Sequence, residues 1–331
     1  MFVSFKVQRF NILCSCFSLQ TGHLSMKVRL QTLAVYSLMT LISWFPRVLS
    51  GAIGNLIGYL NLRLETRSSK VTRTNIELCF PELSDDEKTK LVAESLKNTG
   101  RNVMETPAAW MGSFDRISQW ITRVENSELF EKAYDQGDGV IVILPHLGSW
   151  ELFNVYFATN PIGEMAGLYQ PPDKPWLQSI MAEIRGRFGN ELVPTTRKGI
   201  TRLYRCLGDG GLVTILPDQV PETGDFVPFF GEQALTDRLI SRLQQKTGAR
   251  IICCFVKRLS EKEGFAVCFR EPDPDVYAED SLVSMAGINK SIEACVREVP
   301  AQYQWEYKRF RERPEGSLRI YNYEGDSWTH H

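Results

Sequence analysis

Apolar positions follow three successive patterns along the chain. Residues 30–62 are almost continuously apolar, with Arg47 as the only charge and Pro46 as a break. Residues 84–111 place apolar side chains at helical spacing behind Ser84, which resembles an N-cap followed by an acidic first turn. The remainder alternates short β-branched runs with helical segments. The pattern therefore predicts a hydrophobic start, a long helix and an alternating region.

The alternating region predicts a layered fold. Strands are expected at 140–145, 164–169, 191–194, 212–217 and 250–258, and helices at 149–158, 174–188, 199–208 and 235–247. A run such as VIVILP is typical of a parallel strand buried on both faces. A helical or mixed segment is expected before it, to about Gln136. This alternation predicts an α/β fold with a largely parallel central sheet flanked by helices.

The hydrophobic start has two interpretations. A spanning helix needs about 20 mostly apolar residues, and 30–46 is slightly shorter and contains several hydroxyl side chains. A pair of core helices broken at Pro46 would explain the pattern. The flanks favour a membrane anchor, since Trp44 and Phe45 end the first helix. Cations suited to anionic headgroups lie on both sides, namely Lys27, Arg29, Arg63, Arg67, Lys70 and Arg73.

These patterns give a domain plan for the 331 residues. Residues 1–25 lack the plan of a signal peptide and form an extension of uncertain status. We expect an N-terminal hydrophobic helical membrane anchor over 26–67, one catalytic domain over 68–318, and a C-terminal tail over 319–331. One domain is reasonable because α/β folds of this length are often single.

Composition excludes several classes of protein. The 38 basic and 39 acidic residues give a net charge of −1, which argues against a nucleic-acid binder dominated by phosphate contacts. The eight cysteines form no CxxC framework, so a reducing compartment is expected. His146 is the one histidine between the leader and the C-terminal end. A histidine-rich metal site is thereby excluded, and any histidine catalysis must use His146.

The position of His146 suggests chemistry. It follows the predicted strand 140–145, and sites in open α/β sheets form beyond the carboxyl ends of strands. Gly148 allows a tight turn and Ser149 is a candidate N-cap, so Glu151 could accept a hydrogen bond from Nδ1 and orient Nε2 toward a substrate. That is the base-and-orienter arrangement of acyl transfer. On spacing alone, a glutamate at a helix start beside an incidental histidine explains the motif as well.

HLGSWE, in the form His-x-Gly-x-Trp-Glu, resembles the His-x4-acidic motif of the lysophospholipid acyltransferase superfamily, in the variant of the late acyltransferases of lipid A biosynthesis. Further blocks resemble the same family in the same order: TNIELCFPELS, LYQPPDKPWLQSIMAEIRGRFG, GGLVTILPDQVPETGDFVPFFGEQALT and QYQWEYKRFRERP. A single motif would be weak, but ordered blocks over residues 70–315 make the resemblance specific.

The resemblance implies a bacterial inner-membrane enzyme with its catalytic domain on the cytoplasmic face. It implies acyl-acyl carrier protein as donor, a hydroxyl of a lipid A precursor as acceptor, and no cofactor or metal. His146 and Glu151 would form the catalytic pair. Acylation of another glycolipid such as a lipid mannoside, a catalytically silent membrane scaffold and a soluble esterase remain alternatives.

Other residues are candidates for substrate binding. Arg185 and Arg187 could bind anionic groups, although a solvated helix face explains them equally well. Gln170 stands where many relatives carry arginine, which puts one anion contact in doubt. Asp218 and Gln219 follow the predicted strand 212–217, and the resemblance makes them part of the site wall.

Three further segments have open interpretations. The basic group Arg197, Lys198, Arg202 and Arg205 could meet an acidic carrier protein or a lipid phosphate. FVPFFG (226–231) suits either an acyl chain or core packing. WEYKRFRERP (305–314) has the composition of an amphipathic basic surface.

Overall fold

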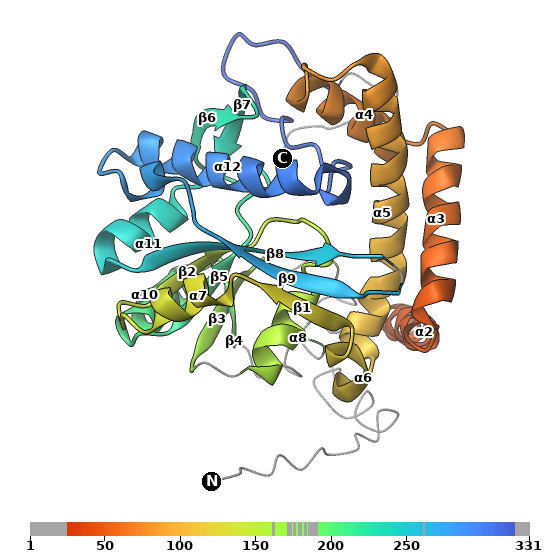
Figure 1. Ribbon diagram of the computed structural model, residues 1–331, viewed down its shortest axis with the longest axis horizontal. Helices are drawn as coiled ribbons and strands as arrows, with labels where there is room; N and C mark the ends of the chain where they lie inside the picture. The colour runs from red at the N-terminus through yellow and green to blue at the C-terminus, as the bar shows by residue number, and fades with distance from the viewer. Residues whose placement is uncertain are drawn as a thin grey trace.

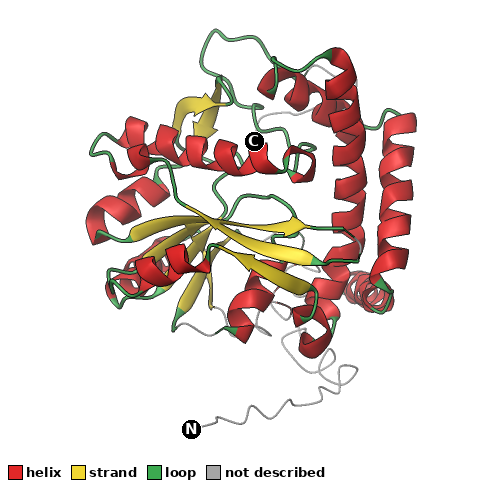
Figure 2. Cartoon of the chain, viewed as in Figure 1, coloured by secondary structure: helices red, strands yellow, loops and turns green. Residues whose placement is uncertain are grey.

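The computed structural model describes residues 25–160, 163–170, 174, 177, 181, 184, 191–260 and 262–321. In this part of the chain a seven-stranded sheet has the order β1-β9-β8-β2-β5-β3-β4 and lies between layers of helices (Figures 1 and 2). The predicted α/β fold with a largely parallel central sheet is confirmed.

Five neighbouring strands of the sheet run parallel, and the two at one edge run the opposite way. The strands are β1 (Ile121–Glu125), β2 (Val140–Ile143), β3 (Met165–Tyr169), β4 (Glu191–Pro194), β5 (Leu212–Ile215), β8 (Arg250–Arg258) and β9 (Phe265–Arg270). β2 lies between β5 and β8, and all four of its residues are fully buried. A β-branched run at this position contributes apolar side chains to both faces.

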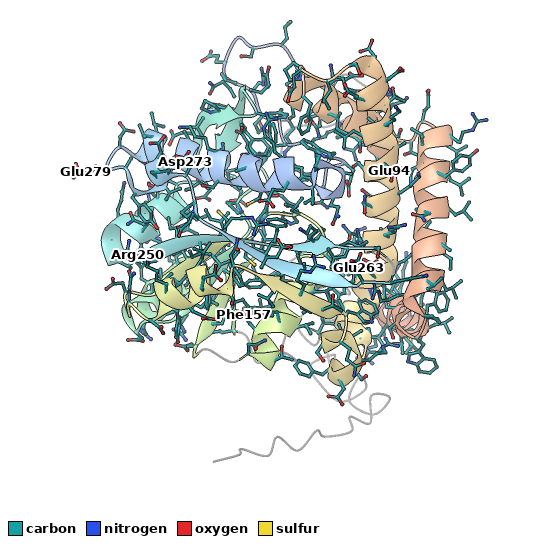
Figure 3. All side chains as sticks on the ribbon, in the orientation of Figure 1. Glu94, Phe157, Arg250, Glu263, Asp273 and Glu279 are labelled. Carbon is teal, nitrogen blue, oxygen red and sulfur yellow. The ribbon has the colours of Figure 1, made fainter. Side chains whose placement is uncertain are left out.

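Each face of the sheet is covered by its own helices. On one face α7 (Ser127–Tyr134) and α8 (Leu152–Thr159) pack on the β2 positions 140 and 142. On the other face three helices pack on positions 141 and 143: α10 (Arg197–Gly208), α11 (Leu239–Thr247) and α12 (Ser281–Glu298). Side chains fill both layers, with Phe157 in the first (Figure 3). The alternation of β2 thus builds two cores.

The sequence misplaced several boundaries. The expected helix 235–247 begins too early, because α11 starts at Leu239 and the preceding residues belong to the antiparallel pair of β6 (Asp225–Phe229) and β7 (Glu232–Thr236). The edge strand β1 was missed because most of its side chains are exposed and it lacks an apolar run. The short elements α6 (Phe114–Ser118), η2 (Pro274–Tyr277) and η3 (Pro300–Gln302) complete this region.

Helices in the N-terminal third of the chain form a wall beside the sheet. It contains α2 (Met26–Ser43), α3 (Arg47–Arg63), α4 (Arg67–Cys79) and α5 (Asp85–Met111). The capping box at Ser84 is present, and the break at Pro46 separates α2 from α3 as expected. α3 lies against α5 through Gly54 and Gly58, where an added Cβ would come within 2.6 Å of α5 backbone atoms. Only glycine permits this close approach.

In the described part of the chain, no single helix is long and apolar enough to cross a membrane. α2 and α3 together meet that test, but they are bent by 119° at their junction. Their outward sides expose apolar residues, including Leu30, Leu33, Leu38, Leu41, Trp44, Val48, Leu56, Tyr59 and Leu60.

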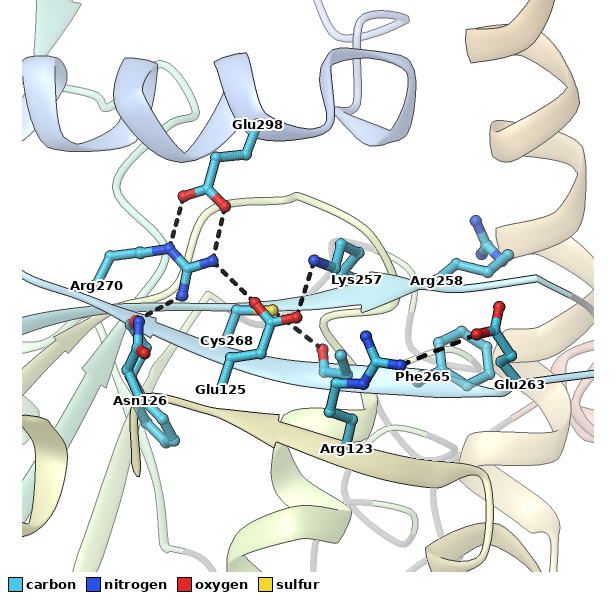
Figure 4. A network of polar contacts seen from close by, with 12 residues as sticks. Arg123, Glu125, Asn126, Lys257, Arg258, Glu263, Phe265, Cys268, Arg270 and Glu298 are labelled. Carbon is cyan, nitrogen blue, oxygen red and sulfur yellow. Dashed lines mark hydrogen bonds and ion pairs between the residues drawn. The ribbon is translucent and has the colours of Figure 1, made fainter. Parts of the chain in front are cut away.

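Charged side chains tie β1, β8, β9 and α12 together at the far edge of the sheet (Figure 4). Glu125 of β1 accepts from Lys257 at 3.0 Å and from Arg270 at 2.9 Å, and Arg270 also donates to Glu298 at 2.6 Å. Burial opposes the charge of Glu125, but the hydrogen bonds from Arg270 and Lys257 lower its pKa to about 2. We call these four residues the edge network.

The C-terminal segment differs from its prediction. Trp305 and Phe310 are fully buried in the core and Arg309 is buried with them, so WEYKRFRERP is not an amphipathic surface. Its mixed composition resembled an interfacial helix, but the segment forms no helix and runs through the core. The cysteines in the described ranges are free and buried: Cys79, Cys206, Cys253, Cys254, Cys268 and Cys295.

Candidate active site

His146 lies in the loop between β2 and α8, three residues beyond the end of β2. Gly148 in this loop has a φ of +65°. A Cβ at Gly148 would also collide with the carbonyl oxygen of Val256. Both the backbone conformation and the close approach to β8 therefore require glycine here.

Backbone hydrogen bonds fix the His146 loop to two other segments. The N–H of Gly148 donates to Gln302 O at 2.9 Å, and the N–H of Ser149 donates to Val256 O at 2.8 Å. The N–H of Gln304 donates to His146 O at 3.1 Å. The loop is thus bound on one side by β8 and on the other by the segment after η3, which makes the position of the imidazole rigid.

A buried ion pair supports the loop from α5. Asn102 donates to Gly148 O at 3.1 Å, and its own side-chain oxygen accepts from Arg258. Arg258 also pairs with Glu105 at 2.6 Å, with both side chains almost completely buried. Because each charge is paired, the arrangement links α5, β8 and the loop without an uncompensated charge.

Asp218 holds the imidazole ring. Its Oδ1 lies 2.8 Å from His146 Nδ1, and its Oδ2 accepts the His146 backbone N–H at 2.8 Å. The strand register explains this meeting: Ile143 pairs with Ile215 across β2 and β5, and His146 and Asp218 each follow three residues later. A carboxylate at Nδ1 fixes the tautomer that carries its proton there.

The two partners differ in exposure. The Asp218 side chain is 1% exposed, whereas that of His146 is 15% exposed. Burial favours a neutral acid at Asp218, but the charge and hydrogen bonds of His146 outweigh burial and lower the pKa of Asp218. The carboxylate therefore stays ionised behind the ring, and the ring reaches the surface of the site.

The second nitrogen of the ring faces an amide. Gln219 Nε2 lies 3.2 Å from His146 Nε2 and 3.3 Å from Gln304 Oε1. With the ring proton on Nδ1, the amide N–H of Gln219 donates to the Nε2 lone pair. The Trp150 ring packs against the imidazole in an edge-to-face arrangement, with ring centroids 5.1 Å apart. His146 Nε2 is thus an unprotonated acceptor with a hydrogen-bond donor beside it.

Two further groups lie behind Asp218. The hydroxyl of Tyr303 forms a hydrogen bond with Asp218; burial, followed by the charge of Asp218, raises the pKa of Tyr303 well above its usual value. The guanidinium of Arg309 is buried nearby and donates to Leu235 O at 2.6 Å and to Thr236 Oγ1 at 3.0 Å. Burial lowers the pKa of Arg309. The sequence analysis assigned neither role: Arg309 belongs to the segment 305–314 that was interpreted as a surface, and Tyr303 lies just before that segment.

Glu306 is a second carboxyl near His146. It accepts from Thr99 of α5 at 3.0 Å, and burial raises its pKa, although the charge of His146 opposes that effect. No group of three or more potential ligands suited to a metal ion occurs among the described residues. The contacts of the ring with Asp218 and Gln219 allow His146 Nε2 to act as a base, oriented by Asp218.

Comparisons with known proteins identify the family that carries this arrangement. A family model described as bacterial lipid A biosynthesis acyltransferase matches residues 20–312. The chain belongs to that family. It is 32% identical over 270 residues to the lipid A biosynthesis lauroyltransferase of Escherichia coli K12, covering 80% of this chain and 86% of that protein.

Two other relatives from Escherichia coli K12 match similar lengths. The palmitoleoyltransferase of lipid A biosynthesis is 29% identical over 277 residues, which cover 81% of this chain and 87% of that protein. The myristoyltransferase is 24% identical over 261 residues, or 78% of this chain and 80% of that protein. This chain is accordingly an acyltransferase of lipid A biosynthesis.

The expected hydrogen bond between His146 and Glu151 is absent from the described part of this acyltransferase, since Nδ1 contacts Asp218 and no hydrogen bond or ion pair joins His146 to Glu151. A catalytic role of Glu151 stays a prediction. Glu151 is partly exposed at the start of α8. Ser149 is not the N-cap, because α8 begins at Leu152 with Glu151 in that position. The turn after Gly148 thus places the glutamate away from Nδ1.

The remaining candidates have different outcomes. Gln219 touches His146, whereas Gln170 is exposed at the end of β3, two strands from β2. Arg185 and Arg187 lie outside the described residues. Phe229 and Phe230 of FVPFFG are buried core residues, so core packing is the correct interpretation for them.

Proposed function

We propose that this lipid A acyltransferase uses His146, oriented by Asp218, as the general base that moves an acyl group from acyl-acyl carrier protein to a hydroxyl of a lipid A precursor. The observation that carries the proposal is the pair of contacts on one ring: a buried carboxylate at Nδ1 and a side-chain amide at Nε2, on a ring that is partly exposed. A neutral imidazole held in that way is suited to accept a proton near neutral pH.

The reaction conserves its protons. Nε2 removes the hydroxyl proton of the lipid as that oxygen attacks the thioester carbonyl, and a tetrahedral intermediate forms with its charge on the former carbonyl oxygen. Asp218 stabilises the imidazolium that results. When the carbon–sulfur bond breaks, the imidazolium returns its proton to the carrier thiolate. The products are an ester and a free thiol.

The oxyanion needs donors close to Nε2. The backbone N–H groups of Leu147, Gly148 and Ser149 already donate to Pro145, Gln302 and Val256, so they cannot provide this stabilisation without breaking the loop. The side-chain amide of Gln219 lies beside Nε2 and would be released when a hydroxyl takes its place. We assign it the role of oxyanion donor.

The family and its resemblances support the substrates. The relatives are named as lipid A biosynthesis acyltransferases, which favours a lipid A precursor over another glycolipid such as a lipid mannoside. An intact His146 with an ionised partner argues against a silent scaffold. Carrier-protein dependence and a bacterial inner-membrane location, with the catalytic domain at the cytoplasmic face, follow from the resemblance of the ordered sequence blocks.

Membrane attachment explains why α2 and α3 leave large apolar side chains exposed. α3 turns Gly51, Gly54 and Gly58 toward the protein and leaves Leu56 and Leu60 exposed, the opposite of a helix that packs in water. Small residues at the contact and large apolar residues outside are typical of helices in lipid. We propose that this outward surface enters the bilayer.

Purified protein with labelled acyl-carrier protein and a lipid A precursor tests the activity. Wild type should produce acylated lipid, and His146→Ala should reduce the rate by at least about a thousandfold while the protein remains folded. Thioester hydrolysis without lipid acylation would indicate an esterase, and an inactive wild type would indicate a scaffold. If the enzyme acylates a lipid mannoside in place of the lipid A precursor, the proposed acceptor is wrong, but the proposal that His146 is the base still stands.

Vesicle sedimentation tests the attachment separately. Leu38→Lys with Leu41→Lys should release the protein from vesicles, because two charges would enter the apolar surface. Leu282→Lys with Val283→Lys is the matched control, since these residues are also exposed and apolar but lie on α12. Equal binding by the two variants would refute the assignment.

A further inference from the structure

The helix α10 carries a basic face. At 100° per residue, Arg197, Thr201, Arg205 and Lys198 fall within an arc of about 100°, while Leu203 and its buried neighbours lie on the opposite side. The same basic residues and Arg202 line a shallow depression of about 350 Å³. The sequence of this helix therefore separates a core side from a cationic side.

Most of that charge is uncompensated. Arg202 is neutralised by Glu164 and Glu191. Arg197, Lys198 and Arg205 are exposed and have no acidic partner in the part of the chain that the structure describes. These three residues are named the α10 basic face. Three unpaired cations on one helix stand out in a chain whose total charge is −1.

Two of these cations are unfavourable for the helix itself. Arg197 and Lys198 occupy its first turn, which contains no acidic residue. The positive end of the helix dipole disfavours cations there. Local rules of this kind are broken mainly where function requires it. The cations thus serve a purpose other than stability.

The α10 basic face begins at the same level of the sheet as His146. Parallel pairing places Ile143 beside Ile215, and Thr214 beside Gly167, which pairs with Leu192 of β4. His146 follows a few residues after Ile143, and α10 begins a few residues after Leu192, so both lie just beyond the carboxyl ends of their strands. Three strand spacings separate β2 from β4, or about 14 Å between strand axes. An acyl donor with a flexible arm could dock on the α10 basic face and react at His146.

The basic face is not placed for the membrane. The exposed apolar surface belongs to α2 and α3, and Figure 1 shows α10 on the other side of the sheet from those helices. A bilayer that contains α2 and α3 would leave α10 free to meet a partner in water. An acidic protein surface has the complementary charge.

We propose that the α10 basic face docks the acidic acyl carrier protein, so that its thioester arm extends along the carboxyl edge of the sheet to His146. This inference rests on the carrier-dependent acyl transfer proposed above. Long-range attraction between the two surfaces would raise the rate of encounter and make it sensitive to salt.

Charge reversal at the helix start tests the docking. Arg197→Glu with Lys198→Glu should raise KM for acyl-carrier protein about tenfold at low salt, with kcat almost unchanged, and the effect should shrink at high salt. The unfolding midpoint should stay equal or rise, because glutamate suits the first turn. With the same acyl group on a short neutral thiol, the variant and wild type should react alike.

Matched reversals separate the outcomes. Lys90→Glu with Lys132→Glu changes the same charge at exposed sites on α5 and α7 and should leave KM unchanged. A native KM for acyl-carrier protein in the α10 variant would refute the docking proposal but not the proposed acyl transfer. Loss of binding to phosphatidylglycerol vesicles with an unchanged KM would assign the face to lipid instead. A wild type that cannot use acyl-carrier protein refutes the donor itself.

Discussion

Asp218 and Glu125 are both carboxylates with lowered pKa values, yet their surroundings differ in kind. Glu125 is bound between Lys257 and Arg270, and Glu298 completes the edge network. Every member of that network has an oppositely charged partner. Asp218 instead faces a titratable ring that has a second nitrogen at the surface of the site.

The difference shows what identifies a reactive site. A perturbed pKa records strong interactions, and structural ion networks produce one as readily as catalytic groups do. The edge network has no group with an open position for substrate, whereas His146 Nε2 is held only by an amide that can move. Substitutions at the His146–Asp218 site should therefore lower activity, whereas substitutions in the edge network should lower stability.

The largest effect is expected at Asp218. Asp218→Asn should lower kcat by about a thousandfold to ten-thousandfold, because it removes the charge that stabilises the imidazolium and leaves one acceptor where two are used. Steady-state acyl-transfer rates measure this loss.

Glu151→Gln is the comparison for that variant. It should lose less activity than Asp218→Asn, because the ring forms its Nδ1 hydrogen bond with Asp218 and not with Glu151. A larger loss in Glu151→Gln than in Asp218→Asn would mean that the histidine turns toward Glu151 when substrate binds.

A smaller loss is expected at Gln219. Gln219→Leu removes the amide donor beside Nε2 and should lower kcat by roughly tenfold to a hundredfold, with little change in KM or in the pH profile. Single-turnover acyl transfer isolates the chemical step. Native turnover in this variant would transfer the oxyanion role to other donors.

Tyr303→Phe should have an effect of only a few-fold. It removes a hydrogen bond from Asp218 but leaves both contacts of that carboxylate with His146 in place. Steady-state kcat measures the effect, and a loss as large as that of Asp218→Asn would contradict the proposed chain of contacts.

At Glu125 no effect on activity is expected, and the change should appear in stability alone. Its lowered pKa means that its contribution to stability is complete above its ordinary pKa of 4.5 and is lost as pH falls toward about 2. Glu125→Gln should cost on the order of 2 kcal/mol at pH 7 and progressively less below pH 4. Denaturant unfolding in detergent at several pH values measures this difference. Reduced turnover with unchanged stability in Glu125→Gln would mean that the edge network, like the His146–Asp218 site, contributes to activity.

The sequence by itself determined the local structure. The β-branched run at 140–143 predicted a buried strand, and the capping serine at 84 predicted the start of α5. It also placed His146 beyond a strand end, with Gly148 at the turn. Each of these follows from side-chain shape and spacing within a few residues.

The tertiary structure decided which groups meet. Glu151 is five residues from His146, yet the ring pairs with Asp218, 72 residues away, because β2 and β5 are neighbours in register. Strand order depends on the packing of the whole sheet and has no local signal. For the same reason Trp305 and Arg309 could not be recognised as buried, since their basic and aromatic neighbours fit a membrane surface equally well until the core closes around them.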